Sequence, residues 1–365
     1  MPGSGRGSFA ISTSGTHPGP VVAITGAASG VGKALTERLS VSGAVSRVVA
    51  LDEVRGDTPG VTWRVVDIRD PLLAGRLSDV DVIVHVDVDR SPESDPRVRR
   101  TYNLRGAQTV LASAAAARVG RVVLLSTAAV YGASADNPVP LPETSRMAAA
   151  PDSSVVGDFL EIEEHAAQRL HPGLEITVVR PAALTGPGID TVVTRHFEAP
   201  RLLAAKGVPP CWQFCHVDDL VSALELAATG EVTGTVAVGC DGFLGSAEVE
   251  EITGKRTFEL PASVTFGTAQ RLHRLGITPA PATDLYYVVY PWVVDCARLR
   301  AAGWKPAHDN ASALQALLAE SLGRHAVAGR RVGGKEATMA TAAGATVAVI
   351  GAAAAVRRAR KKRRN

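Results

Sequence analysis

Near the start of the chain, a glycine-rich turn joins an apolar run to a segment with helical spacing. Residues 21–25 (VVAIT) predict a short buried strand, and residues 33–43 (KALTERLSVSG) have the spacing of a helix. The turn between them contains Gly26, Gly30 and Gly32. A strand, a glycine turn and a helix in this order are typical of a site that holds the pyrophosphate of a dinucleotide.

Each glycine of the turn has its own role in such a site. Gly26 allows a tight turn, Gly30 lets the backbone approach a pyrophosphate, and Gly32 lets the helix pack closely on the strand. The first turn of the helix offers free N–H groups and the positive end of its dipole to the phosphates. We therefore expect the cofactor to be held by Gly26, Ser29, Gly30, Val31 and Gly32.

A second predicted strand, over residues 47–51, ends in an acidic residue. Asp52 lies twenty residues beyond Gly32, where a carboxylate can hold the ribose hydroxyls of NAD. Because Asp52 would repel a 2′-phosphate, NAD is favoured over NADP, although Lys33 and Arg55 are nearby cations that weaken this preference. The alternative is that Asp52 is an ordinary acid at the end of a strand.

Apolar runs and helical segments continue to alternate along the chain. Further strands are expected over residues 61–66, 80–88 and 121–126, with a helix over 97–119. This alternation predicts an α/β fold with a doubly wound parallel sheet covered on both faces. A chain of 365 residues, of which 46% are hydrophobic, is long enough for two domains or for one large domain with an appendage.

Several short motifs follow the glycine turn. They are Asp67-Ile68, Asn103-Leu-Arg-Gly106, residues 126–132 (STAAVYG), Arg180-Pro181 with Gly186-Pro187-Gly188, and His216-Val217-Asp218-Asp219. With the spacing Thr25-Gly26-x-x-x-Gly30-x-Gly32, they resemble the extended short-chain dehydrogenase/reductase superfamily, specifically its NAD-dependent epimerase/dehydratase family. The resemblance covers roughly residues 20–320.

The resemblance implies a Rossmann domain, over residues 21–186, and a smaller C-terminal substrate-binding lobe, over residues 187–322, whose elements interleave with the first. It also implies NAD as the cofactor, a nucleotide-sugar-type substrate and a homodimer. Asp67 and Ile68 would hold the adenine, and Pro181 would also contact the cofactor. Thr127 would hydrogen-bond the reacting hydroxyl, as the one candidate catalytic residue, and no metal is expected.

The family also needs a tyrosine and a lysine four residues apart on the helix expected over residues 155–170. When this segment is aligned to the family pattern Y-G-x-S-K-x-x-x-E with Glu164 at the glutamate position, Val156 occupies the tyrosine position and Leu160 the lysine position. Tyrosine is absent between residues 131 and 286, and lysine between residues 33 and 206. We therefore expect a catalytically divergent protein. The alternative is a non-catalytic NAD(P)-binding sensor or scaffold module.

Other polar side chains near the expected site have competing interpretations. Asp158, Glu161 and His165 are conceivable substitutes on the helix, but we favour a solvated helix face for each. His216 is interpreted as a hydrogen-bonded structural histidine. Asp87 replaces a small apolar residue of the family beside the cofactor, so it would either repel the cofactor or point into solvent.

The two ends of the chain differ from the body in composition. Residues 1–20 predict a disordered leader, and residues 323–336 a linker. Residues 337–365 form an alanine-rich segment with a basic tail, whose last nine residues include seven basic ones. This segment is interpreted as binding an anionic membrane surface or a polyanion, and thereby tethering the module of the alternative hypothesis. A solvated extension is the other interpretation.

Four cysteines are too few for a disulfide scaffold. The spacing Cys211-x3-Cys215-His216 suggests a metal site only faintly, because no second pair completes four ligands. We expect reduced, buried thiols and a cytoplasmic protein, with peripheral membrane association through the tail as a further possibility.

Overall fold

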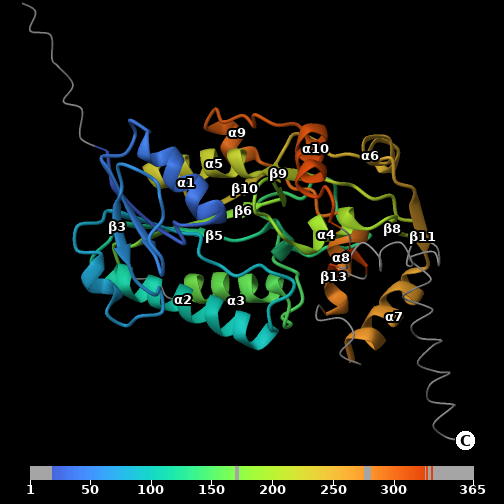
Figure 1. Cartoon of the computed structure of the whole chain (residues 1–365), viewed down its shortest axis with the longest axis horizontal. Helices are drawn as coiled ribbons and strands as arrows, with labels where there is room; N and C mark the ends of the chain where they lie inside the picture. The colour runs from blue at the N-terminus through green and yellow to red at the C-terminus, as the bar shows by residue number, and fades with distance from the viewer. Residues whose placement is uncertain (1–18, 169–171, 275–280, 325, 328–329, 332–365) are drawn as a thin grey trace, which may run out of the picture.

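A parallel sheet of seven strands forms the centre of the computed structural model (Figure 1). The structure describes residues 19–168, 172–274, 281–324, 326–327 and 330–331. Across the sheet the strands are β10 (Thr235–Val238), β6 (Glu175–Pro181), β5 (Arg121–Leu125), β4 (Val82–His85), β1 (Val21–Thr25), β2 (Arg47–Asp52) and β3 (Thr62–Val65). This arrangement confirms the predicted doubly wound α/β fold.

The order of the strands reverses beside β1. The chain runs outward on one side through β2 and β3, then crosses to β4 on the other side of β1 and continues outward through β5, β6 and β10. In open sheets of this kind, ligands bind at the carboxyl ends of the strands where the order reverses. That edge is formed by Thr25 of β1, Asp52 of β2 and His85 of β4.

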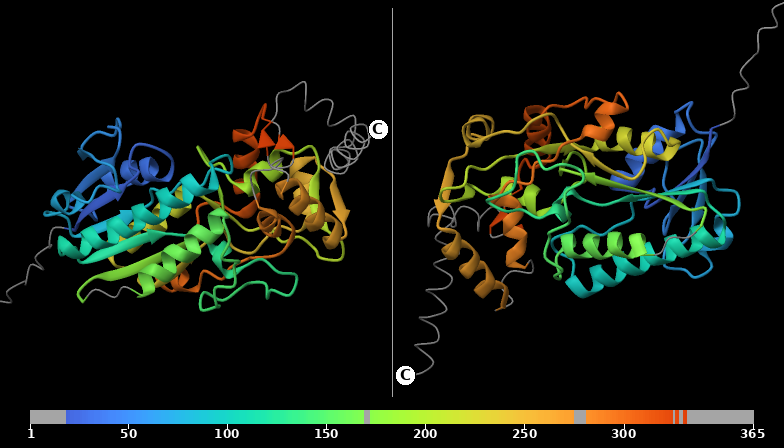
Figure 2. Two further views of the ribbon diagram at one scale, coloured as in Figure 1. Left: turned by 90° about the horizontal axis from the view of Figure 1, so that it is seen from below. Right: turned by 180° about the vertical axis from the view of Figure 1, so that it is seen from behind.

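Two pairs of helices cover the two faces of the sheet. One face carries α1 (Gly30–Ser40) and α5 (Val217–Thr229), and the other carries α2 (Pro96–Ala116) and α3 (Val155–Gln168) (Figure 1). Figure 2 shows α2 and α3 side by side along that face. Because α5 and β10 come from the later part of the sequence, the Rossmann unit is completed by residues of the expected C-terminal lobe.

The smaller lobe lies beyond the carboxyl ends of the strands (Figures 1 and 2). Its two-stranded sheets pair β8 with β11, β7 with β9, and β12 with β13. Its elements are β7 (Ala183–Thr185), α4 (Val192–Glu198), β8 (Leu202–Ala205), β9 (Phe214–His216), α6 (Ser246–Thr253), β11 (Thr257–Leu260), α7 (Ala262–Arg274), η3 (Ala282–Leu285), α8 (Tyr286–Val289), α9 (Ala297–Ala301), α10 (Asn310–Glu320), β12 (Ala326–Val327) and β13 (Arg330–Arg331). Two short 3-10 helices, η1 (Leu73–Arg76) and η2 (Ala128–Tyr131), lie in the first half of the chain.

Part of the expected linker is built into this lobe. The strands β12 and β13 pair antiparallel, and Arg331 forms ion pairs with Glu198 of α4 and with Asp190. Most of the expected leader and the whole of residues 337–365 lie outside the described residues. Within the described ranges, no helix has the length and apolarity to cross a membrane.

A buried ion pair joins α2 to α3. Arg99 Nε donates to Asp158 Oδ2 at 2.9 Å, and the two side chains are only 4% and 0% exposed. Asn103 donates to the same carboxylate oxygen at 3.1 Å. The prediction that Asp158 lies on a solvated helix face is therefore wrong. Its carboxylate is turned inward because the helix presents it to Arg99, a partner that the helix sequence alone does not reveal.

We expect Asp158→Ala to destabilise the fold by about 3–5 kcal/mol, since the Arg99 guanidinium would remain buried without its partner. The matched control is Glu161→Ala on the same helix, because Glu161 pairs with Arg100 at the surface. That change should cost less than about 1 kcal/mol. Urea denaturation of both variants measures the difference, and equal losses would contradict the role given to the buried pair.

Candidate functional site

The glycine turn forms a cradle at the amino end of α1. A Cβ on Gly32 would lie 1.9 Å from the Gly26 carbonyl oxygen, so only glycine fits where the helix meets the turn. Gly26 and Gly30 have φ angles of +65° and +50°, which glycine adopts with little strain. A Cβ on Gly30 would meet no atom within 4 Å, so space is open in front of the turn.

The amino end of α1 is prepared for an anion. Ser29 is its N-cap residue, yet the Ser29 side chain makes no capping hydrogen bond, and the described first turn carries no acidic residue. The first N–H groups of a helix need partners from outside the helix, and its dipole favours a negative charge there. Open space, uncapped N–H groups and the close contact that Gly32 permits together fit a pyrophosphate.

Asp52 braces the turn from the neighbouring strand. Its Oδ2 accepts from the Ala28 N–H at 3.0 Å, and its Oδ1 accepts from the Val54 N–H at 3.1 Å. The carboxylate is therefore held at the end of β2, beside the turn. Each carboxylate oxygen can accept a second hydrogen bond, so a role toward a ribose hydroxyl stays a prediction.

Asp67 and Ile68 follow β3, the strand next to β2 in the sheet, and they differ in exposure. Ile68 is buried against α2, where a Cβ on Gly106 would come within 2.5 Å of its Cδ1 atom. Asp67 is engaged by Arg69, whose Nη2 donates to Asp67 Oδ2 at 2.7 Å. This hydrogen bond is the largest cause that lowers the pKa of Asp67. The Arg69 guanidinium also lies over the Tyr102 ring, 4.7 Å from its centre.

Asp87 lies directly beside the turn. A Cβ on Gly26 would be 3.1 Å from the Asp87 Cα and Cβ atoms, and Tyr102 Oη donates to Asp87 Oδ1 at 2.9 Å. The carboxyl is therefore directed to Tyr102. Burial, opposed by the Tyr102 hydrogen bond and reinforced by Asp52, raises the pKa of Asp87 to about 6. The expectation of a group pointing into solvent is wrong, and a negative charge here would oppose a bound phosphate.

A largely apolar pocket opens where β5 and β6 end. It is lined by Thr127, by residues 181–184 after β6, by α3 and by residues of the C-terminal lobe that include Tyr287 and Trp292. Thr127 is the N-cap of η2, and its Oγ1 accepts from the Ala129 N–H at 3.2 Å. The structure therefore places two predicted site residues, Thr127 and Pro181, in one pocket.

The face of α3 that meets this pocket includes only one of the two residues expected there. Val155, Val156 and Phe159 line the pocket, whereas Leu160 does not. Residues four apart share a helix face, so Glu163 continues the face of Val155 and Phe159. Val155 and Phe159, which are four residues apart, both line the pocket, whereas of Val156 and Leu160 only Val156 does.

A buried ion pair sets this orientation of α3. Arg180 Nε donates to both Glu163 oxygens, at 3.0 and 3.1 Å, and Ser126 donates to the same carboxylate. Ser126 follows β5 and immediately precedes Thr127, so the contact fixes which face of α3 looks at Thr127. The sequence comparison used Glu164 for this place, but Glu164 is exposed.

Two tyrosines near the pocket are poor candidates for proton exchange. Tyr131 Oη donates to the Glu143 carbonyl at 2.7 Å, and its ring lies under the Arg180 guanidinium. Tyr287 comes from the distant C-terminal lobe and does line the pocket. Burial, followed by the nearby carboxylates Asp284 and Asp152, raises the pKa of Tyr287, which is the opposite of what an exchanging phenol needs.

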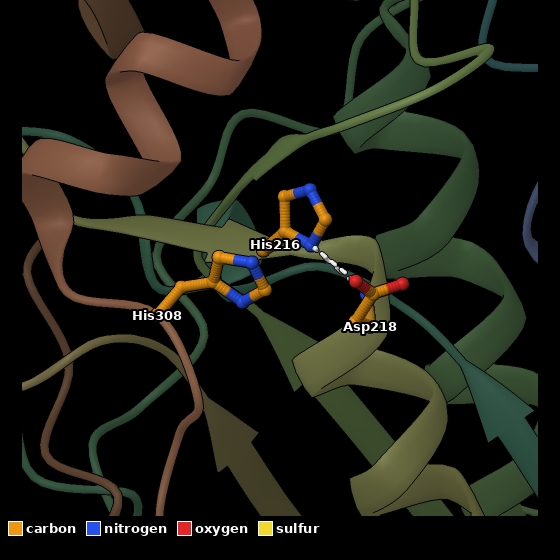
Figure 3. A group of neighbouring side chains, drawn as sticks. All are labelled: His216, Asp218 and His308. Atoms are coloured by element: carbon orange, nitrogen blue, oxygen red, sulfur yellow. Dashed lines mark hydrogen bonds and ion pairs between the residues drawn. The ribbon is translucent and has the colours of Figure 1, made fainter.

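His216 is a capping residue of α5. Its Nδ1 accepts from the Asp218 N–H at 3.2 Å, and its ring stacks on His308 with 3.9 Å between ring centres (Figure 3). His216, Asp218 and His308 bring their ligand atoms within 4.8 Å of one another. However, His216 Nδ1 accepts from the Asp218 N–H, and His308 Nδ1 lies 3.1 Å from Asp219 Oδ2, so both rings are held by contacts within the chain. We assign the cluster a structural role, as predicted for His216.

The cysteines are all unpaired thiols. Cys215, Cys240 and Cys296 are buried, and burial is the largest cause that raises the pKa of each. Thiols of this kind are inert packing residues. These three agree with the prediction of buried thiols, whereas Cys211 is only partly buried.

The chain is similar in sequence to an established protein family and to several curated proteins. A model of the NAD dependent epimerase/dehydratase family matches residues 22–239. The uncharacterized protein Rv0501 of Mycobacterium tuberculosis is 30% identical over 301 residues, covering 78% of this chain and 80% of the relative. The dTDP-glucose 4,6-dehydratase of Streptomyces niveus is 29% identical over 239 residues, covering 61% and 65%.

The fold is also found among solved structures. The UDP-glucose 4-epimerase of Thermus thermophilus, in complex with NAD, superposes with a TM-score of 0.61 at 20% sequence identity. The alignment covers 83% of this chain and 99% of the epimerase. The likeness establishes a shared architecture of Rossmann sheet and smaller lobe.

We expect Asp87→Asn to stabilise the protein by about 2–3 kcal/mol at pH 7.5 and by about half as much at pH 5. An acid with a raised pKa binds more protons when folded, so its contribution to stability declines as the pH rises from about 4 in the unfolded state to about 6 in the folded state. The neutral amide keeps the Tyr102 hydrogen bond and avoids that loss.

The free energy of unfolding in urea at both pH values measures the effect. Asp136→Asn, at an exposed site, is the control and should change neither value. An Asp87→Asn protein with the same difference from the wild type at pH 5 and pH 7.5 would contradict the prediction.

Proposed function

The chain belongs to the NAD-dependent epimerase/dehydratase family, and from that premise we propose that it binds NAD at the glycine turn and acts on a nucleotide-sugar-type substrate in the adjoining pocket. The observation that carries the proposal is that two features lie at the same edge of the sheet, where the parallel strands end. An uncapped glycine cradle begins at β1, and a pocket containing Thr127 and Pro181 lies at the ends of β5 and β6. The Thermus enzyme of this architecture holds NAD, and the Streptomyces relative is named for a sugar nucleotide.

The residues that would hold NAD lie at the carboxyl ends of successive strands of the sheet. The turn residues Gly26, Ser29, Gly30, Val31 and Gly32 would face the pyrophosphate. NAD, when bound, would supply the acceptor for a hydride.

The remaining contacts would come from neighbouring strands. Asp52 would face the adenosine ribose, Asp67 and Ile68 the adenine, and Pro181 the nicotinamide end. The Asp52 carboxylate favours NAD over NADP, since it would meet a 2′-phosphate with like charge. At the far end of the site, the Thr127 hydroxyl would orient the substrate hydroxyl, while Val155 and Phe159 would exclude water from this part of the pocket.

The chemistry would differ from that of the family because the tyrosine–lysine pair is replaced by apolar side chains. Loss of acid–base assistance typically costs about 10²- to 10⁴-fold in rate. The same replacement favours the second candidate, a non-catalytic NAD(P)-binding sensor or scaffold, in which residues 337–365 would provide a tether to anionic lipid or a polyanion.

Titration with NADH and NADPH, followed by nicotinamide fluorescence, tests the cofactor site. We expect saturable NADH binding in the wild type, and a loss of about 10- to 100-fold in NADH affinity for Asp52→Ala, as for a lost hydrogen bond to a charged group. NADPH binding should fall less, because the repulsion of the 2′-phosphate is removed with the carboxylate.

The control for this titration is Asp57→Ala, which removes an exposed carboxylate that pairs with Lys33 of α1. It should leave both affinities within about twofold. Absence of saturable NADH binding by the wild type would refute the proposal, and equal losses for the two nucleotides would refute the ribose role of Asp52.

Restoring the family pair distinguishes an enzyme-like site from a binding module. We expect Val155→Tyr with Phe159→Lys to give NAD-dependent turnover of a nucleotide sugar such as UDP-glucose or dTDP-glucose. The matched control, Val156→Tyr with Leu160→Lys, places the same groups one residue along and should give none. Inactivity of the first pair in a protein that still binds NADH would favour the module. Mass spectrometry of nucleotides released by denaturing the purified protein would identify the natural ligand.

A further inference from the structure

Two side chains of opposite charge, Arg90 and Asp284, line the apolar pocket. Arg90 follows β4, and its Nη2 atom is buried without a hydrogen-bond partner among the described residues. Asp284 lies on η3 in the C-terminal lobe, where it is partly buried and lines the same pocket. Because a buried polar atom without a partner is costly, the Arg90 guanidinium points to a ligand that supplies the missing contact, and Asp284 lines the same pocket.

Arg90 lies beside the position on α3 at which we expect the lysine of the family. The Arg90 guanidinium lies over the Phe159 ring, with its central carbon 5.3 Å from the ring centre. Phe159 follows Val155 by four residues, the spacing at which the lysine of the family follows its tyrosine, and both line the pocket. The guanidinium therefore brings a positive charge to the space that an ammonium on α3 would otherwise occupy, from a different strand end.

Asp284 has the surroundings of a proton-exchanging acid. Burial and the neighbouring Asp152 raise the pKa of Asp284 to about 7, and Arg99 on α2 partly opposes the shift. Asp152 itself accepts a hydrogen bond from Thr283. Tyr287 of α8 lines the same pocket, and burial raises the pKa of its phenol, so it stays neutral.

We propose that Asp284 exchanges the proton of the substrate hydroxyl in this pocket, and that Arg90 provides the positive charge of the missing lysine. The proposal rests on the NAD-dependent function proposed above. It assigns the reaction to one group from each lobe, so that the site is complete only when the C-terminal lobe packs over the carboxyl ends of the strands.

The proposed oxidation of a substrate alcohol balances in atoms and electrons with the groups present and the proposed cofactor. The proton of the substrate hydroxyl moves to the Asp284 carboxylate. The hydrogen on the carbon that bears this hydroxyl leaves with its electron pair for the nicotinamide ring. The alcohol becomes a carbonyl, the carboxylate becomes a carboxylic acid, and the dinucleotide is reduced. Thr127 orients the hydroxyl, and Arg90 compensates negative charge on its oxygen as the proton departs.

The emission of bound NADH as a function of pH tests the proposal without a known substrate. The nicotinamide should report the charge beside it, so at saturating NADH we expect a transition with a midpoint near the Asp284 pKa of about 7. Asp284→Asn should abolish the transition. Asp152→Asn should move it to lower pH, because a negative neighbour is removed. All variants are made in the Asp87→Asn background, so that the titration of Asp87 does not contribute.

Arg90 is tested by the affinity for NADH. We expect Arg90→Gln to weaken binding about tenfold and Arg90→Lys to restore most of the loss, because charge rather than shape is needed. The control is Asp295→Asn, at an exposed site in the same lobe, which should alter neither the transition nor the affinity.

The outcomes separate this proposal from the function on which it rests. A transition that survives Asp284→Asn, or a flat profile in a protein with Asp284 that binds NADH, would overturn the role of Asp284. Equal NADH affinity of Arg90→Gln and the parent would overturn the role of Arg90. Failure of every variant and of the wild type to bind NADH would instead refute the proposed cofactor function.

Discussion

The close approach of α1 to the end of β1 is the contact on which the rest of the site depends. It is possible only because Gly32 has no Cβ, since that atom would overlap the Gly26 carbonyl oxygen. With this contact made, the uncapped amino end of α1 faces open space at the edge where the strand order reverses. Asp52 from β2 and Asp87 from the end of β4 then lie against the same turn from its two sides. A bulkier residue at position 32 would displace all of these groups together.

A second constraint, the buried pair of Glu163 and Arg180, determines what the pocket contains. It turns α3 so that Val155 and Phe159 face Thr127, and it leaves this side of the pocket without an ionisable group. The pocket is lined by Arg90, Arg99, Asp284 and Tyr287, so its charged and titratable side chains come from elements other than α3.

Local patterns predicted the sheet well and the site less well. The strand over residues 21–25 is the observed β1, because an apolar run bounded by proline and glycine has few alternatives. The strand expected over residues 80–88 ends at His85, since Asp87 turns toward Tyr102. Of the two α3 residues predicted to face the site, Val156 lines the pocket and Leu160 does not. The sequence alone does not distinguish Glu163 from Glu164, and only the structure shows that Arg180 pairs with Glu163. Asp158 was misjudged for the same reason, since its partner Arg99 lies on another helix.

By itself, the order of residues determined the Rossmann architecture, the glycine cradle, the family and the absence of a tyrosine–lysine pair, because each depends on short-range spacing or on composition. The tertiary structure alone decided which face of α3 meets the pocket, where Asp87 points, and that Asp284 and Tyr287 join Thr127. These outcomes depend on contacts between segments far apart in the chain, whose geometry is set by packing and by the burial of charge. Such contacts leave no periodic trace in the sequence.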